Sequence, residues 1–137
     1  MTLERRYALR AFALGAFFIF CGIAFGAFGA HALRDVLDQY HRDVYEKAVF
    51  YQLVNALGIL AGALAGESQL VADNIVRKIP LILSAGIVFF SGSLYALAIT
   101  DLRFLGAITP IGGTLFLIGW ILVTLDVWKD LSGRAVK

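Results

Sequence analysis

Charged residues are excluded from four long runs of this chain. The runs cover residues 11–30, 48–66, 79–100 and 104–125, and none of the 12 Lys and Arg or 10 Asp and Glu residues lies inside them. Each run is 19–22 residues long, and a helix of about 20 apolar residues crosses the hydrocarbon layer of a membrane. A soluble domain needs charge on every element that meets water, so the pattern predicts four membrane-spanning helices.

The expected fold is an all-α, four-helix transmembrane bundle. Its spans are predicted at about 11–31, 44–66, 79–100 and 105–128. At 137 residues the chain has room for a single integral membrane domain over 1–137. A hydrophobic content of 60% and a mean hydropathy of +0.80 exclude an ordinary soluble domain. A net charge of +2 is too small to indicate nucleic-acid binding.

The basic N-terminus followed by an apolar run also fits a cleaved signal peptide, with Ala30-His31-Ala32 as the small-residue cleavage site. The uncharged run is 20 residues long, however, whereas the apolar part of a signal peptide has about 7–15 residues. We therefore expect the segment to be kept as the first span.

Basic residues are distributed unevenly between the two sides that four spans define. Eight fall before span one, between spans two and three, and after span four: Arg5, Arg6, Arg10, Arg77, Lys78, Lys129, Arg134 and Lys137. Four fall on the other side: Arg34, Arg42, Lys47 and Arg103. Short cytoplasmic loops are enriched in Lys and Arg, so the bias predicts a multi-pass bacterial plasma-membrane protein with both termini in the cytoplasm.

The loop between spans one and two has a helical pattern of its own. Its apolar residues recur every three or four positions: Leu33, Leu37, Tyr40 and Val44. Charged residues of alternating sign fall on another face: Arg34, Asp38 and Arg42. The pattern predicts a short amphipathic interfacial helix that covers most of 32–41. Asp43 and Glu46 have the spacing of a capping box that opens span two.

Pro110 has two interpretations. As an interior residue of span four it would remove a backbone hydrogen bond and kink the helix. Alternatively, Thr109 caps the helix and Pro110 is its first residue, where the missing N–H costs nothing. In both cases irregular backbone lies near the outer third of the bilayer.

Glycines recur at three- or four-residue spacing in two spans. They are Gly22, Gly26 and Gly29 in span one, and Gly58 and Gly62 in span two. Small residues at this spacing let two helices approach closely in a membrane. We expect these glycines to pack helices together, either within one chain or between two copies of it.

Polar side chains form a stripe on each of the two central spans. Span two carries Tyr45, Gln52 and Asn55, and span three carries Ser91 and Tyr95. Buried amides need hydrogen-bond partners, so we expect the two stripes to face each other with at least one hydrogen bond between them. The stripes are either structural or the lining of a ligand or ion site. The candidate ligand-binding residues are His31, Tyr45, Glu46, Gln52, Asn55, Ser91 and Tyr95.

No pattern of catalytic or metal-binding residues is evident. His31 and His41 are ten residues apart without a further cluster, which is a weak metal signal. No acidic residue lies in the middle of a span, which argues against a carboxylate proton relay. We expect no metal, no cofactor and no enzymatic activity.

Four segments in order along the chain match a known family: GAFGAHAL at 26–33, YEKAVFYQ at 45–52, FSGSLYAL at 90–97 and LGAITPIGG at 105–113. The chain resembles, over about 14–128, the YgdD/YwdK family of small inner-membrane proteins (domain of unknown function 423), whose animal relative is transmembrane protein 256. Family members often carry His where this chain has Asn55. The resemblance implies a four-span plasma-membrane protein with no settled activity, and it assigns no catalytic residues.

Three functions compete on these grounds. The first is a non-enzymatic bundle that binds a lipid or small molecule, or supports a membrane complex. The second is a minimal transporter or channel that uses the polar stripe between spans two and three. The third is an outer-leaflet enzyme that uses His31 and Glu46. The first needs no coordinated reactive groups and fits the sequence best. The expected partners are membrane lipids and a second copy or another membrane protein, with no nucleic acid.

Overall fold

The computed structural model describes residues 2–134 as an array of helices, with no β-strand among those residues. The elements in chain order are α1 (Leu3–His31), α2 (Gln39–Glu67), α3 (Asp73–Ile87), the π-helix η1 (Val88–Gly92), α4 (Ser93–Thr100), the 3₁₀ helix η2 (Arg103–Ala107) and α5 (Thr109–Arg134). Four stretches are long and apolar enough to cross a membrane: Arg5–His31, Gln39–Glu67, Asp73–Thr100 and Arg103–Gly133. The predicted all-α, four-helix membrane fold is confirmed.

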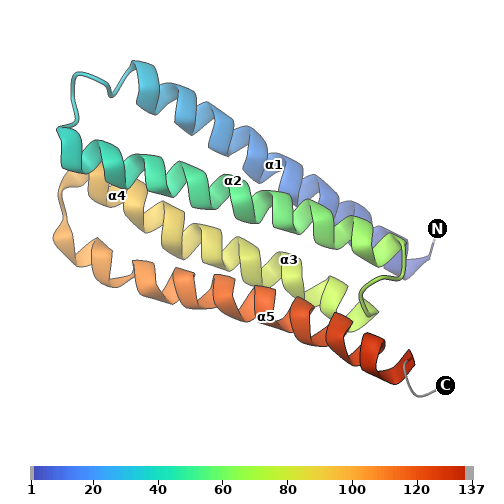
Figure 1. The fold of residues 1–137 in the computed structure, drawn as a ribbon. Coiled ribbons are helices and arrows are strands. Elements are labelled where there is room, and N and C mark those ends of the chain that lie inside the picture. Colours follow the sequence, from blue (N-terminus) through green and yellow to red (C-terminus); the bar gives the residue numbers. More distant parts are fainter. Residues whose placement is uncertain (1, 135–137) are drawn as a thin grey trace.

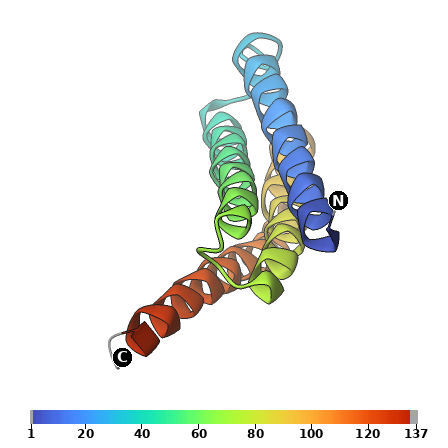
Figure 2. The ribbon, with the colours of Figure 1, turned by 90° about the vertical axis from the view of Figure 1, so that its right-hand side faces the viewer.

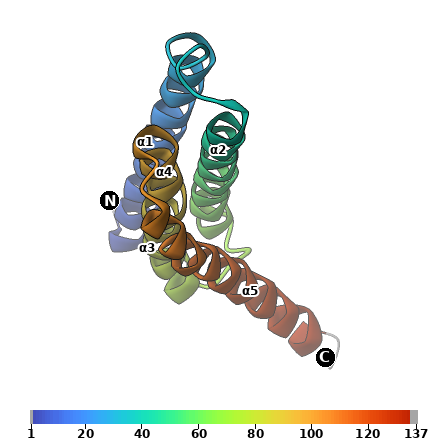
Figure 3. The same cartoon turned by 90° about the vertical axis from the view of Figure 1, so that its left-hand side faces the viewer.

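The helices are arranged around α2. It packs against α1 on one side and against the continuous rod of α3, η1 and α4 on the other, while α5 packs mainly against α3 and η1 (Figure 1). The start of α1 and the end of α5 lie at the same end of the bundle (Figure 1). Seen from the two sides, α5 runs at a steep angle to α2 and carries its C-terminal half away from the other helices (Figures 2 and 3). Lys137, counted in the charge bias, lies outside the described residues.

Two apolar clusters hold the helices together. One lies towards the chain ends and is built on α2, α3 and α5, with Ile59, Leu83 and Phe116 among its buried members. The other lies towards the opposite end, where Leu37, Val44, Tyr45, Leu97 and Ala98 pack together. Between them along α2 come Gln52 and Asn55, which are 3% and 2% exposed. A buried polar layer therefore separates the two clusters.

The interfacial helix expected between the first two spans is not present. Residues 32–38 form turns, and α2 begins directly after them at Gln39. The supposed apolar stripe does not share one face, because Leu37 is 9% exposed and packs into the bundle whereas Tyr40 is 61% exposed. The turns fold Leu37 back onto α4, which a straight helix over these residues would not do.

The start of α2 also differs from the expected capping box. Asp38 is the N-cap, and its side chain accepts a hydrogen bond of 2.9 Å from the backbone N–H of His41. Asp43 lies inside the helix and accepts a hydrogen bond of 2.7 Å from the side chain of Gln39. Asp at an N-cap satisfies one of the free N–H groups of the first turn, so α2 starts five residues earlier than the Asp43 pattern indicated.

The third spanning rod contains a π-helical turn that the sequence pattern did not predict. Val88–Gly92 is π-helical, and α5 packs against it. A Cβ on Gly112 of α5 would clash with the backbone N of Phe90. Only glycine therefore fits this point of the crossing.

The structure agrees with the interpretation that places Pro110 in the first turn of the helix, although Thr109 is itself the first helical residue and not the cap before it. The helix α5 begins at Thr109, so Pro110 lies in its first turn, where the missing N–H costs nothing. The irregular backbone expected beside it is the 3₁₀ helix Arg103–Ala107. The proline begins the helix and does not kink it.

Candidate functional site

The polar layer is joined by a hydrogen bond between the two stripes. The hydroxyl of Tyr95 donates to Oε1 of Gln52 over 3.0 Å, as the facing stripes predicted. The amide nitrogen of Gln52 donates to the backbone carbonyl of Phe18 on α1 over 2.8 Å. One side chain of α2 thus links α1 and α4 through its two polar ends.

Asn55 has different partners from those expected. Its nitrogen donates to the carbonyl of Tyr51 in the preceding turn over 2.9 Å, and its oxygen accepts from the indole N–H of Trp120 over 3.1 Å. Trp120 belongs to α5, and sequence reasoning did not assign it a role. Nothing in the apolar pattern around Trp120 marks it, so the signal that could identify it is the buried amide on another helix that needs a partner.

Tyr45 is the residue of the polar stripe on α2 that lies nearest the loop end of the bundle. Its hydroxyl donates to the carbonyl of Phe25 on α1 over 2.9 Å, and its ring meets that of Tyr95 at a centroid distance of 4.9 Å. The Phe25 ring also packs against that of Tyr95, at a centroid distance of 5.1 Å. The aromatic contacts fix the rings whose hydroxyl groups make the hydrogen bonds.

Ser91 is enclosed without a partner. It is 0% exposed, and within the described residues its hydroxyl makes no hydrogen bond. Nearby, Ser93 and Thr109 join α4 to the start of α5 through their hydroxyls at 2.8 Å. Apart from Ser91, the layer is largely saturated by its own contacts.

The glycines identified in the sequence lie against side chains of the same chain. A Cβ at Gly22 would come within 2.7 Å of Leu53, at Gly29 within 2.5 Å of Tyr45, and at Gly58 within 2.6 Å of Trp120. The remaining two have more room, since the nearest atom would be 3.3 Å away at Gly26 and 3.6 Å away at Gly62. Three of the five positions therefore accept no side chain unless the neighbouring Leu53, Tyr45 or Trp120 side chain shifts.

A groove of about 510 Å³ opens between α1 and α2 at the loop end of the bundle. Its walls are apolar: Gly26, Gly29 and Ala30 from α1, and Tyr45, Val49, Phe50 and Leu53 from α2, with Leu37 from the connecting turns. Gly26 and Gly29 line the groove from α1, and a Cβ on either would meet a side chain of α2. Phe50 is 61% exposed at its edge, so the groove faces the surroundings of the bundle and not its core.

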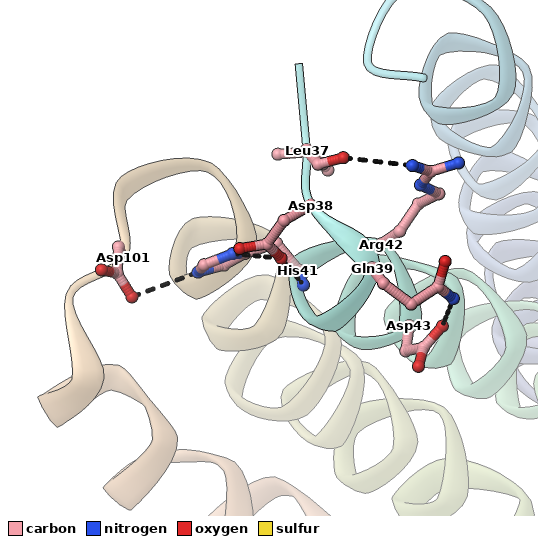
Figure 4. Close-up of polar contacts among 7 residues, drawn as sticks. All are labelled: Leu37, Asp38, Gln39, His41, Arg42, Asp43 and Asp101. Carbon is pink, nitrogen blue, oxygen red and sulfur yellow. Dashed lines mark hydrogen bonds and ion pairs between the residues drawn. The ribbon is translucent and has the colours of Figure 1, made fainter. Parts of the chain in front are cut away.

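The charged residues of this groove are Arg34, Arg42 and Glu46. Arg42 donates from Nη2 to the carbonyl of Leu37 over 3.3 Å (Figure 4), while its Nε is shielded from solvent and has no partner within the described residues. The ion pairs found in residues 2–134 involve neither arginine nor Glu46. Both signs of charge are therefore available at one end of an apolar groove.

His31 and His41 have different surroundings in the structure. His31 is exposed at the end of α1 and makes no hydrogen bond or ion pair in the described part of the chain, so it is not joined to Glu46 or Asp101. His41 instead bridges two carboxylates, with Nδ1 2.9 Å from Asp38 and Nε2 3.1 Å from Asp101 (Figure 4). Donation from both ring nitrogens requires the protonated imidazole.

This His41 bridge ties the start of α2 to the end of α4. Asp101 has a left-handed backbone, with φ of 54°, which Asp tolerates better than most residues. The hydrogen bonds from the backbone N–H and side chain of His41 lower the pKa of the Asp38 carboxyl. Within residues 2–134, no group of three or more His, Cys, Asp or Glu side chains is arranged to hold a metal ion.

Four membrane-competent helices around a buried polar layer define a polytopic α-helical membrane protein. The chain belongs to the family described as protein of unknown function (DUF423), whose sequence profile matches residues 25–113. It is 45% identical over 117 residues to a UPF0382 membrane protein of Staphylococcus saprophyticus, covering 85% of this chain and 94% of the relative. It is 38% identical over 118 residues to the UPF0382 membrane protein YwdK of Bacillus subtilis, covering 86% and 95%. No solved structure matches.

Proposed function

We propose that this protein is a non-enzymatic plasma-membrane bundle that holds one membrane lipid in the groove between α1 and α2. The observation that carries the proposal is the groove itself, whose walls are apolar along its length and whose charged side chains come from its loop end. Its volume of about 510 Å³ falls within the range of small-molecule sites. An amphiphile would fit this groove with its acyl chains along the apolar walls and its headgroup beside the charged side chains at the loop end.

The orientation of the protein in the membrane is part of the proposal. The eight-to-four bias of basic residues favours cytoplasmic termini, and α1 starts at the end of the bundle where α5 finishes (Figure 1). The groove then opens to the outer leaflet. A reporter that is active only outside the cytoplasm, fused after the last residue, should be inactive, and activity there would reverse the orientation.

The polar layer supports a binding bundle over a transporter or channel. Gln52, Asn55 and Tyr95 direct their side-chain donors to one another or to backbone carbonyls, so they are occupied in holding helices together. An enzyme at the outer surface is disfavoured because His31 is not joined to a carboxylate. In this proposal the polar layer is structural, and its hydrogen bonds hold in place the helices that form the lipid groove.

The test of the groove is a variant that fills it. Ala30 lines the groove from an exposed position, and Ala27, one turn earlier and also exposed, does not line it. We expect the protein purified in mild detergent to carry one phospholipid by native mass spectrometry. Ala30→Trp should lose that lipid and Ala27→Trp should keep it. Equal retention by the two variants would place the lipid elsewhere.

A further inference from the structure

We infer that the groove selects a phospholipid whose headgroup carries both a phosphate and a primary ammonium. The inference rests on the proposed lipid groove and names the class of its ligand. It starts from the charges at the loop end, where two guanidinium groups and one carboxylate line a single groove and none of them forms an ion pair within residues 2–134.

The phosphate is assigned to the arginines. A guanidinium presents several N–H donors in a planar fork that matches phosphate oxygens. The Leu37 carbonyl holds one end of the Arg42 guanidinium, and the shielded Nε has no partner in the described chain. The Nε is shielded, so a phosphate in the groove would bind through the part of the Arg42 side chain that lines it. Arg34 reaches the same groove from the connecting turns.

The ammonium is assigned to Glu46. Glu46 follows Arg42 by four residues, so the two side chains are neighbours on one face of α2. They do not pair with each other, although both line the groove. An arginine that precedes a glutamate in a helix is also the weaker of the two orders for such a pair. The unpaired carboxylate would repel a purely anionic headgroup and attract an ammonium beside the phosphate.

The occupant is a lipid and not a free phosphate compound. The wall beyond the charges consists of Gly26, Val49, Phe50 and Leu53, and these positions lie farther along the spanning helices than Arg34 and Arg42. A soluble phosphate compound would make no contact with this apolar wall. Acyl chains would cover it, and the exposed Phe50 ring would lie along them.

The experiment compares three phospholipids with identical acyl chains in native mass spectrometry of the delipidated protein. They carry ethanolamine, glycerol or choline headgroups. We expect the ethanolamine lipid to be retained about fivefold more than the glycerol lipid, the factor that one exposed ion pair can supply. Choline lacks N–H donors, so its lipid should also be retained less. Equal retention of all three would overturn the inference.

The variants separate the two charges. Glu46→Gln should remove the preference for ethanolamine over glycerol, and Asp43→Asn, on the same helix but outside the groove, should not. Arg34→Gln and the double variant Arg34→Gln/Arg42→Gln should lower retention of all three lipids, and Arg103→Gln should not. Unchanged preference in Glu46→Gln, or unchanged retention in the double variant, would refute the headgroup assignment. If Ala30→Trp still loses the lipid, the groove itself would stand, so the two failures are distinguishable.

Discussion

The indole nitrogen of Trp120 lies 3.1 Å from the side-chain oxygen of Asn55. This hydrogen bond joins α5 to α2, although α5 packs mainly against α3 and η1. The ring that donates it also lies over Gly58, where a Cβ would come within 2.6 Å of the indole. One tryptophan therefore satisfies the buried amide and fills the space that the glycine leaves.

Loss of the indole N–H should destabilise the bundle modestly. Trp120→Phe leaves Asn55 Oδ1 without a donor, and interhelical hydrogen bonds in membranes average about 0.6 kcal/mol and reach about 1.7. We expect a loss within that range in denaturant titration of the detergent-solubilised protein. Trp128→Phe, at a side chain that is 68% exposed, is the matched control and should leave stability unchanged. An equal effect of both substitutions would contradict a specific bond.

The link between Gln52 and Tyr95 should appear as a coupling energy. Tyr95→Phe removes the donor and Gln52→Leu removes the acceptor, so the double variant should lose less than the sum of the single variants. The expected coupling is about 0.6 kcal/mol, measured by a double-mutant cycle on unfolding. Gln52→Leu alone should cost more than Tyr95→Phe because it also frees the Phe18 carbonyl. Strict additivity would show that the two side chains do not interact.

Gly29 should tolerate no side chain. A methyl group there meets the Tyr45 ring at 2.5 Å, so Gly29→Ala forces the ring away from Phe25 and separates α1 from α2. Overpacking of this kind costs about 1–3 kcal/mol, which a lower thermal midpoint would report. Gly62→Ala is the control, because its Cβ would be in ordinary contact at 3.6 Å and alanine favours the helix. If the control lost as much stability as Gly29→Ala, the close approach would not be the cause.

The charge of Asp38 should stabilise the fold in a pH-dependent way. Its pKa is lowered below 3.8, mainly by the backbone hydrogen bond from His41 and then by the His41 side chain. A carboxyl with a lower pKa in the folded state stabilises that state above its unfolded pKa and loses the contribution as pH falls through the folded pKa.

Asp38→Asn keeps an N-cap oxygen but removes the charge. The variant should therefore unfold at a lower temperature than the parent at pH 6, and the difference should shrink below about pH 4. Asp35→Asn, a change at an exposed residue of the same turns, should show no difference at either pH. A gap between Asp38→Asn and the parent that stayed constant with pH would contradict a contribution from the charge.

The sequence was most informative where the membrane restricts the composition and length of a segment. A hydrocarbon layer excludes charge and demands about 20 apolar residues, so the four spans were predictable from the charge-free runs alone. The same reasoning found Gln52 and Tyr95, because an amide in lipid needs a partner. It also gave, as one of two alternatives, a helix with Pro110 in its first turn.

The sequence failed where conformation depends on contacts between distant segments. The pattern of Leu33, Leu37 and Tyr40 was helical, but packing of Leu37 against α4 outweighs it. The contact between His41 and Asp101 could not be predicted from the sequence, because the two residues are 60 positions apart. The groove could not be predicted for the same reason, since Arg34 and Arg42 line one groove only when the turns between α1 and α2 are folded.

The π-helical turn at Val88–Gly92 determines which way the side chains of α4 face. Such a turn holds one residue more than an α-helical turn, and each residue rotates a helix by about 100°. The extra residue therefore sets the azimuth of α4 relative to α3, so that α3 can contact both α2 and α5 while α4 turns towards α2. In a regular α-helix of the same sequence, every residue after Gly92 would be rotated by about 100°, and Tyr95 would point away from Gln52.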